Sequence, residues 1–212
     1  MRVILAKTAG FCYGVKRAVD LAEETAGRRG GCVMLGSLIH NAHVVERLHR
    51  MGVRQVDGID GITPQDTVLI RAHGEKKQTI DQLRQMNVSC VDATCPNVLR
   101  MQQIVAQAQE EGRVPLMIGE PHHPEVIGVA SWSERTVVFP GPAELKKWLA
   151  EDPSRREYPL TAVAQTTCIR SIWESSAEIL KKECTNVKIF DTICNASKSA
   201  NRKQPNWLAR LT

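Results

Sequence analysis

The stretch that decides the fold occurs twice: CYGVKRAVDLAEETAGRRGGCVMLGSLIH spans residues 12–40, and CPNVLRMQQIVAQAQEEGRVPLMIGEPHH spans residues 95–123. The two copies align at a constant offset of 83 residues. Each predicts a helix followed by a short apolar strand, so the chain contains repeated structural units. The aligned positions are Cys12 with Cys95, Arg17 with Arg100, Met34 with Met117, Gly36 with Gly119 and His40 with His123.

A third copy begins near the C-terminus. Residues 190–194, FDTIC, resemble residues 91–95, VDATC, but the matching glycine and histidine would lie beyond Thr212. We therefore expect a pseudo-three-fold arrangement of small α/β lobes in which the third lobe is mostly missing. The expected lobes are residues 1–96, residues 97–190 and a remnant at residues 191–212.

Apolar runs and helical patterns alternate along the whole chain. This alternation predicts an α/β fold with mostly parallel sheets and with its chemistry in loops at the carboxyl ends of the strands. The expected strands are residues 2–6, 32–35, 67–70, 88–92, 116–118, 136–139, 160–164 and 187–190. The expected helices are residues 16–26, 44–51, 77–86, 98–111, 124–131, 142–151 and 172–182.

Three cysteines, Cys12, Cys95 and Cys194, stand at the ends of strand-like runs. A three-fold arrangement would bring their sulfurs to a common axis, where three thiolates make a metal site with one open corner. An iron there would be a Lewis acid that can also pass electrons. No role is assigned to Cys168, and the other cysteines are interpreted as small buried hydrophobes, namely Cys32, Cys90 and Cys184.

Three histidines, His40, His73 and His123, follow apolar strands, and loop positions of this kind favour a functional role. Glu125 and Thr166 stand in similar places, although Glu125 could be a capping carboxylate and Thr166 could bond the backbone at a strand end. The remaining histidines are interpreted as surface or packing residues, namely His43, His49 and His122.

Composition narrows the class of protein. Aromatic residues make up only 4% of the chain, which disfavours binding of single-stranded nucleic acid, and the net charge of +5 suits phosphorylated ligands or an acidic protein partner. No apolar run is long enough to cross a bilayer, and no signal peptide is predicted. We therefore expect a cytoplasmic protein without a membrane contact, whose seven cysteines are thiols or ligands rather than disulfides.

Seven motifs in order resemble those of the 4-hydroxy-3-methylbut-2-enyl diphosphate reductase family. They are GFCYGVKRA (10–18), HN (40–41), AHG (72–74), DATCP (92–96), HPEVIG (123–128), QTT (165–167) and TICNA (192–196). The resemblance implies a three-lobed α/β iron-sulfur enzyme of the non-mevalonate isoprenoid pathway. Such enzymes reductively remove the allylic hydroxyl of their substrate and yield isopentenyl and dimethylallyl diphosphates.

The resemblance also implies residue roles. Glu125 would supply a proton, and Thr166 would orient the substrate hydroxyl. Ferredoxin or flavodoxin would deliver two electrons to the basic surface. The implied ligands of a 4Fe-4S cluster are Cys12, Cys95 and Cys194, and the implied substrate-binding residues are His40, Asn41, His73, His123 and Thr166.

The C-terminal segment departs from the family pattern. The serine and asparagine loop that the resemblance implies for a third lobe has no match in residues 197–212, and Pro205 interrupts the expected helix. We therefore expect a C-terminally truncated chain with reduced stability and activity. Three interpretations stay open: a reductase, a non-catalytic cluster-binding remnant, and a structural zinc module with three cysteines and one histidine as ligands, which is disfavoured because structural zinc ligands usually come in close pairs.

Overall fold

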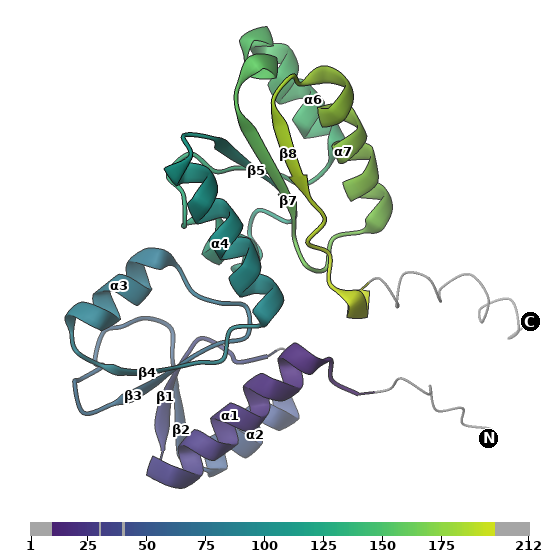
Figure 1. The fold of residues 1–212 in the computed structure, drawn as a ribbon. Helices are drawn as coiled ribbons and strands as arrows, with labels where there is room; N and C mark the ends of the chain where they lie inside the picture. The colour runs from purple at the N-terminus through teal and green to yellow at the C-terminus, as the bar shows by residue number, and fades with distance from the viewer. Residues whose placement is uncertain (1–9, 30, 40, 198–212) are drawn as a thin grey trace, which may run out of the picture. The chain divides into compact units, whose positions relative to one another are not determined.

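The computed structural model describes residues 10–29, 31–39 and 41–197, which form two compact units (Figure 1). The first unit contains the described residues up to Ala72 together with Leu83–Cys95. The second contains His73–Gln82 and the described residues from Pro96 onward. The expected strand at residues 2–6, His40 and residues 198–212 lie outside the described residues.

The first unit is built on a four-stranded parallel sheet with the order β2-β1-β3-β4. Helix α3 lies across the division between the two units. The elements are α1 (Tyr13–Arg29), β1 (Cys32–Leu35), α2 (Ala42–Arg50), β2 (Val53–Val56), β3 (Thr67–Ile70), α3 (Lys77–Gln85) and β4 (Ser89–Asp92).

The second unit has a parallel sheet of the same topology, with the order β6-β5-β7-β8. Its strands occupy the places of β2, β1, β3 and β4, so the repeat and the parallel α/β class are confirmed. The elements are α4 (Pro96–Glu110), β5 (Val114–Ile118), α5 (Pro124–Ala130), β6 (Val137–Phe139), α6 (Pro142–Glu151), the 3-10 helix η1 (Pro153–Glu157), β7 (Leu160–Ala164), α7 (Arg170–Glu183) and β8 (Val187–Phe190).

Alternating side chains bury both faces of the first sheet. Cys32 and Met34 of β1 pack with residues of α1 and α2, whereas Val33 and Leu35 pack in a separate cluster that includes Leu83 of α3. Successive side chains of a strand point to opposite faces, so the four apolar residues of β1 fill two cores.

In the second unit, one face of the sheet packs against α6 and α7. Leu116 and Ile118 of β5 share a buried cluster with Leu145 and Leu149 of α6 and Trp173 of α7. Helix α4 also contacts β5 and β7, and it buries Val98, Met101, Val105 and Ala108. Burial on both faces explains why β5 and β7 read as continuous apolar runs.

Two expectations about the strands were wrong. Strand β2 was not predicted, because it lies at the edge of its sheet and exposes Arg54 and Gln55. Cys90 was expected to be buried but is exposed, since it lies on β4 at the opposite edge. Cys32 is buried as expected, and Cys184 is partly buried against the second core.

The glycine shared by the two repeats has the same packing role in each. The Gly36 amide donates to Val56 O at 2.8 Å, and the Gly119 amide donates to Phe139 O at 2.9 Å. A Cβ added at Gly36 would lie 2.6 Å from Nη1 of Arg71, and a Cβ added at Gly119 would lie 2.7 Å from Cβ of Gln165. Each glycine therefore makes room for the residue that follows the neighbouring strand.

We expect Gly119→Ala to lower the free energy of unfolding by about 1–3 kcal/mol, because the Gln165 side chain would have to move. The matched control is Gly27→Ala on the exposed surface of α1, where an added Cβ meets nothing within 4 Å. That control should be neutral or stabilising by up to ~1 kcal/mol. Urea unfolding followed by tryptophan fluorescence measures both, and equal midpoints for Gly119→Ala and wild type would contradict the tight contact.

Candidate functional site

The turn that precedes Cys95 is fixed by backbone and side-chain hydrogen bonds. Asp92 Oδ1 accepts from the Thr94 amide at 2.8 Å. The Ala93 amide donates to Ile70 O at 3.0 Å, and the Cys95 amide donates to Ala72 O at 2.9 Å. The end of β3 therefore sets the position of Cys95.

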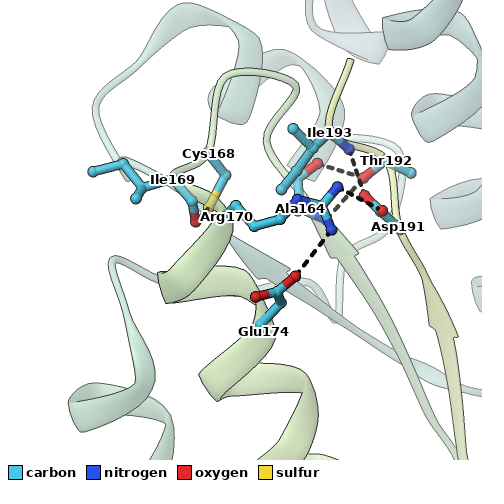
Figure 2. A network of polar contacts seen from close by, with 8 residues as sticks. All are labelled: Ala164, Cys168, Ile169, Arg170, Glu174, Asp191, Thr192 and Ile193. Carbon is cyan, nitrogen blue, oxygen red and sulfur yellow. Dashed lines mark hydrogen bonds and ion pairs between the residues drawn. The ribbon is translucent and has the colours of Figure 1, made fainter. Parts of the chain in front are cut away.

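The turn that precedes Cys194 repeats this arrangement in the second unit (Figure 2). Asp191 Oδ1 accepts from the Ile193 amide at 3.2 Å, and the Cys194 amide donates to Thr166 O at 2.9 Å. The Thr192 hydroxyl donates to Ala164 O and accepts from the Ala164 amide. The two cysteines therefore follow one structural pattern.

An ion-paired arginine contacts Asp191 of the turn that precedes Cys194 (Figure 2). The Arg170 guanidinium at the start of α7 donates to Asp191 Oδ2 at 3.1 Å and to Glu174 Oε1 at 3.3 Å. These side chains are well exposed, so water screens the ion pairs and they contribute little to stability. Their effect is to restrict the Asp191 carboxylate to one orientation.

All three candidate cysteines directly precede a helical segment. The Cys12 carbonyl accepts from the Lys16 amide at 2.9 Å at the start of α1, and Cys95 precedes α4. Cys194 precedes a helical turn at residues 195–197, and the Ser197 amide donates to Cys194 Sγ at 3.4 Å. The amides and partial positive charge of a helix N-terminus favour a negatively charged ligand such as a metal-bound thiolate.

The three cysteines fit a metal or iron-sulfur group in their chemistry. Cys12 is exposed and Cys95 and Cys194 are partly exposed, so their sulfurs are accessible. An added Cβ at Gly14 would lie 2.5 Å from Cys95 Sγ, so only glycine leaves this sulfur its place. Soft thiolate donors suit zinc and iron-sulfur clusters.

The candidate cysteine ligands are divided between the two units. Cys12 and Cys95 belong to the first unit and Cys194 to the second, and no group of three potential ligands that could hold a metal ion occurs among the described residues. All seven cysteines are described, and none forms a disulfide.

Two of the three candidate histidines meet in the second unit. The rings of His73 and His123 lie edge to face, with centroids 5.5 Å apart and an interplanar angle of 87°. His123 is the N-cap of α5, and its Nδ1 accepts from the Glu125 amide at 3.1 Å. A neutral imidazole that accepts at Nδ1 carries its proton at Nε2, which is then a donor for an anionic ligand.

Glu125 and Thr166 form a buried pair, with 3% and 6% of their surfaces exposed. Glu125 Oε1 accepts from the Thr166 amide, and Oε2 accepts from the Thr166 hydroxyl, both at 2.7 Å. Both oxygens therefore bind the loop after β7, which argues against the helix-capping interpretation of the carboxylate. Because Thr166 O also accepts from the Cys194 amide, the carboxyl group is two hydrogen bonds from a candidate cluster ligand.

Burial raises the pKa of the Glu125 carboxyl group above its usual value. The two hydrogen bonds from Thr166 and the nearby His123 lower this pKa, but the loss of hydration outweighs them. A raised pKa lets this carboxyl group keep its proton to a higher pH than an exposed glutamate does, which is the direction that favours a general acid.

A model of the LytB protein family matches residues 3–209. The chain belongs to the LytB family. The matched range ends at residue 209 and so includes most of residues 197–212, the segment that was expected to depart from the family pattern.

Relatives and solved structures agree with this assignment. The 4-hydroxy-3-methylbut-2-enyl diphosphate reductase of Caldanaerobacter subterraneus subsp. tengcongensis is 36% identical, over 93% of this chain and 68% of the relative. The reductase of Geobacter sulfurreducens is 37% identical, over 99% of this chain and 72% of the relative.

A solved structure of (E)-4-hydroxy-3-methyl-but-2-enyl diphosphate reductase, the terminal enzyme of the non-mevalonate pathway, is 34% identical with a TM-score of 0.78, covering 92% of this chain and 69% of that one. The Plasmodium falciparum E-1-hydroxy-2-methyl-but-2-enyl-4-diphosphate reductase is 23% identical with a TM-score of 0.83, covering 91% of this chain and 60% of that one, and supports the fold alone. In the described part of this LytB-family chain, no helix is long and apolar enough to span a membrane.

Sequence reasoning missed two contributions to the site of this LytB-family member. Gln165 Oε1 accepts from the Glu120 amide at 3.0 Å and so holds the loop that leads to His123. Asn41 Oδ1 accepts from the Val44 amide at 3.2 Å and caps α2, a role that an asparagine before a helical pattern could have indicated. The other histidines are exposed as expected, namely His43, His49 and His122.

Cys168 belongs to the second apolar core rather than to the set of candidate ligands. It is 8% exposed, and its thiol contacts Ile169 O at 3.5 Å. Burial raises the pKa of this thiol, which makes the reactive thiolate scarcer.

The raised pKa of Glu125 predicts a pH-dependent stability difference from Glu125→Gln. At a pH between the two pKa values, the folded chain still binds the Glu125 proton while the unfolded chain has released it. The contribution of this proton to the stability of the folded chain is therefore complete below the unfolded pKa and is lost as pH rises through the folded pKa. As pH rises from the unfolded pKa through the folded pKa, wild type should therefore lose stability relative to Glu125→Gln, by about 1.4 kcal/mol for each unit of pKa difference.

Urea unfolding at several pH values measures this difference. Glu134→Gln, at an exposed carboxylate of the same unit, is the control and should give a flat difference. A flat difference for Glu125→Gln as well would show that Glu125 titrates alike in both states.

Proposed function

We propose that this chain is a 4-hydroxy-3-methylbut-2-enyl diphosphate reductase. In this reaction the allylic carbon-oxygen bond breaks, two electrons and two protons are taken up, and water leaves together with isopentenyl or dimethylallyl diphosphate. The names of the relatives support the substrate, and the buried pair of Glu125 and Thr166 beside the Cys194 turn is the observation that supports the chemistry.

Cys12, Cys95 and Cys194 are the proposed ligands of a 4Fe-4S cluster. When bound, such a cluster supplies electrons and a Lewis-acidic iron with an open position. Their place before helical segments favours thiolate ligands, and Gly14 leaves room for the sulfur of Cys95. Electrons would come from ferredoxin or flavodoxin, whose acidic surfaces suit a chain of net charge +5.

The protein groups have separate proposed roles. Glu125 holds a proton and donates it to the leaving hydroxyl, while the Thr166 hydroxyl fixes the orientation of the carboxyl group and of the substrate hydroxyl. His123 offers Nε2–H to the diphosphate, and His73, whose ring packs edge to face on His123, is a second proposed diphosphate ligand. His40 and Asn41 are proposed as further diphosphate ligands on the strength of the family motif; for Asn41 this role would fall to the amide nitrogen, because its oxygen caps α2.

The proposed lobes follow the repeated cysteine turns. Residues 1–96 and 97–190 would each form one lobe, and residues 191–212 would begin a third. The support is that residues 191–194 repeat the hydrogen bonds of residues 92–95 at the start of a further helical segment.

We expect Cys12→Ser, Cys95→Ser and Cys194→Ser each to lose most of the bound iron, because each removes one thiolate ligand. The matched control is Cys90→Ser, which changes an exposed cysteine of β4 and should keep the iron content of wild type. Iron and sulfide per chain after anaerobic purification, together with Mössbauer spectra, separate an iron-sulfur cluster from zinc. Equal iron loss in Cys90→Ser would contradict the ligand assignment.

Glu125→Gln should lower turnover about a hundredfold or more while iron content stays unchanged, because it removes a proton donor and not a ligand. Glu134→Gln, an exposed carboxylate of the same unit, should retain the wild-type rate. Turnover of the hydroxylated diphosphate with a reduced electron donor measures both. A wild-type chain that binds the cluster without turnover would instead support the non-catalytic alternative.

A further inference from the structure

Arg17 joins helix α1 to the turn that carries Cys95. Its guanidinium donates through Nη1 to Thr94 O and through Nη2 to Asp92 O, each at 3.1 Å. All of these residues belong to the first unit. Because α1 begins directly after Cys12, this contact connects the segments of two proposed cluster ligands.

A second contact lies on the same side of α1. Gly14 precedes Arg17 by three residues, and residues with this spacing share one face of a helix. The backbone of Gly14 lies so close to Cys95 that an added Cβ would be 2.5 Å from its Sγ. The first turn of α1 therefore touches the sulfur of Cys95, while the second turn holds the carbonyl groups just before it.

The shape of the acceptor pair fits arginine. The carbonyls of Asp92 and Thr94 are held by the bonds that fix their turn, so their spacing is set without Arg17. A planar guanidinium offers donors in a rigid fork that can reach both oxygens at once. A lysine ammonium is a single charged point and satisfies such a pair less well.

The second unit contains the same elements at the repeated positions. Arg100 of α4 takes the place of Arg17, and residues 191–194 take the place of residues 92–95. Arg100 and Asn97 line a polar cavity of about 130 Å³ together with residues 191–195. An arginine five residues after a candidate cysteine thus faces the next cysteine turn in both units.

We propose that Arg17 is a positioning residue that holds Cys95 in place relative to Cys12 before a cluster is bound. The identity of the cluster in this inference rests on the proposed function. The placement of the two thiols does not depend on that function. Arg17 acts through the carbonyls of Asp92 and Thr94, and it touches neither substrate nor reacting atoms.

Cluster retention tests this role in the full chain, purified without oxygen. Arg17→Met should release iron to a chelator at least about tenfold faster than wild type. The rate of iron release from Arg17→Lys should lie between those of wild type and Arg17→Met. Arg28→Met is the matched control on α1, because its exposed guanidinium pairs with Glu24, and it should release iron at the wild-type rate. The thermal midpoint of the chain before cluster loading should be the same in Arg17→Met as in Arg28→Met, which separates positioning from a general loss of stability.

A measurement without iron keeps this inference distinct from the proposed function. A thiol probe with two reactive groups should link Cys12 to Cys95 in wild type and in Arg28→Met, and about tenfold more slowly in Arg17→Met, since a looser contact between α1 and the Cys95 turn lowers the effective concentration of one thiol near the other. Mass spectrometry identifies the linked pair. If wild type takes up no iron but linking slows in Arg17→Met, the cluster assignment fails and the positioning role stands.

Two results would overturn the positioning role. One is iron release and linking at wild-type rates in Arg17→Met. The other is a thermal midpoint that falls in Arg17→Met while linking stays unchanged, because Arg17 would then be an ordinary stabilising contact.

Discussion

The hydrogen bond from the Cys194 amide to Thr166 O is the interaction on which the candidate site depends. It ties a cysteine at the end of β8 to the loop that follows β7, and the same loop binds both oxygens of Glu125. Parallel neighbouring strands end at one edge of their sheet, so the fold itself brings these loops together. A candidate thiol ligand is thereby connected through Thr166 to a hydroxyl group and a carboxyl group.

The surroundings of Glu125 favour a chemical role over a purely structural one. Burial of a carboxylate costs free energy, and the two bonds from Thr166 only partly offset the lost hydration, since the pKa of Glu125 remains raised. A purely structural contact would be satisfied by a neutral side chain of the same shape. A carboxyl group that keeps its proton, next to a hydroxyl group that orients it, is instead suited to repeated proton transfer.

Features with a regular spacing could be predicted from the sequence, whereas features set by tertiary contacts could not. The offset of 83 residues predicted equivalent units because helix and strand order follow apolar periodicity. The exposed Cys90 and the strand β2 were missed because position at a sheet edge depends on strand order, which no local pattern contains. The contacts of Arg17 with Asp92 and Thr94 join residues 75 and 77 positions apart, so only the folded chain brings them together.

The two units have the same sheet topology and the same cysteine turn, but they differ in the side chains around that turn. The Ala72 carbonyl accepts from the Cys95 amide, and the Thr166 carbonyl accepts from the Cys194 amide in the same way. The repeat offset of 83 residues also places Ala42 at the position that Glu125 has in the second unit. The first unit thus has two alanines in place of the buried acid and its hydroxyl partner. Cysteine placement is a property of the repeated turn, while the proposed proton donor depends on side chains that only the second unit carries.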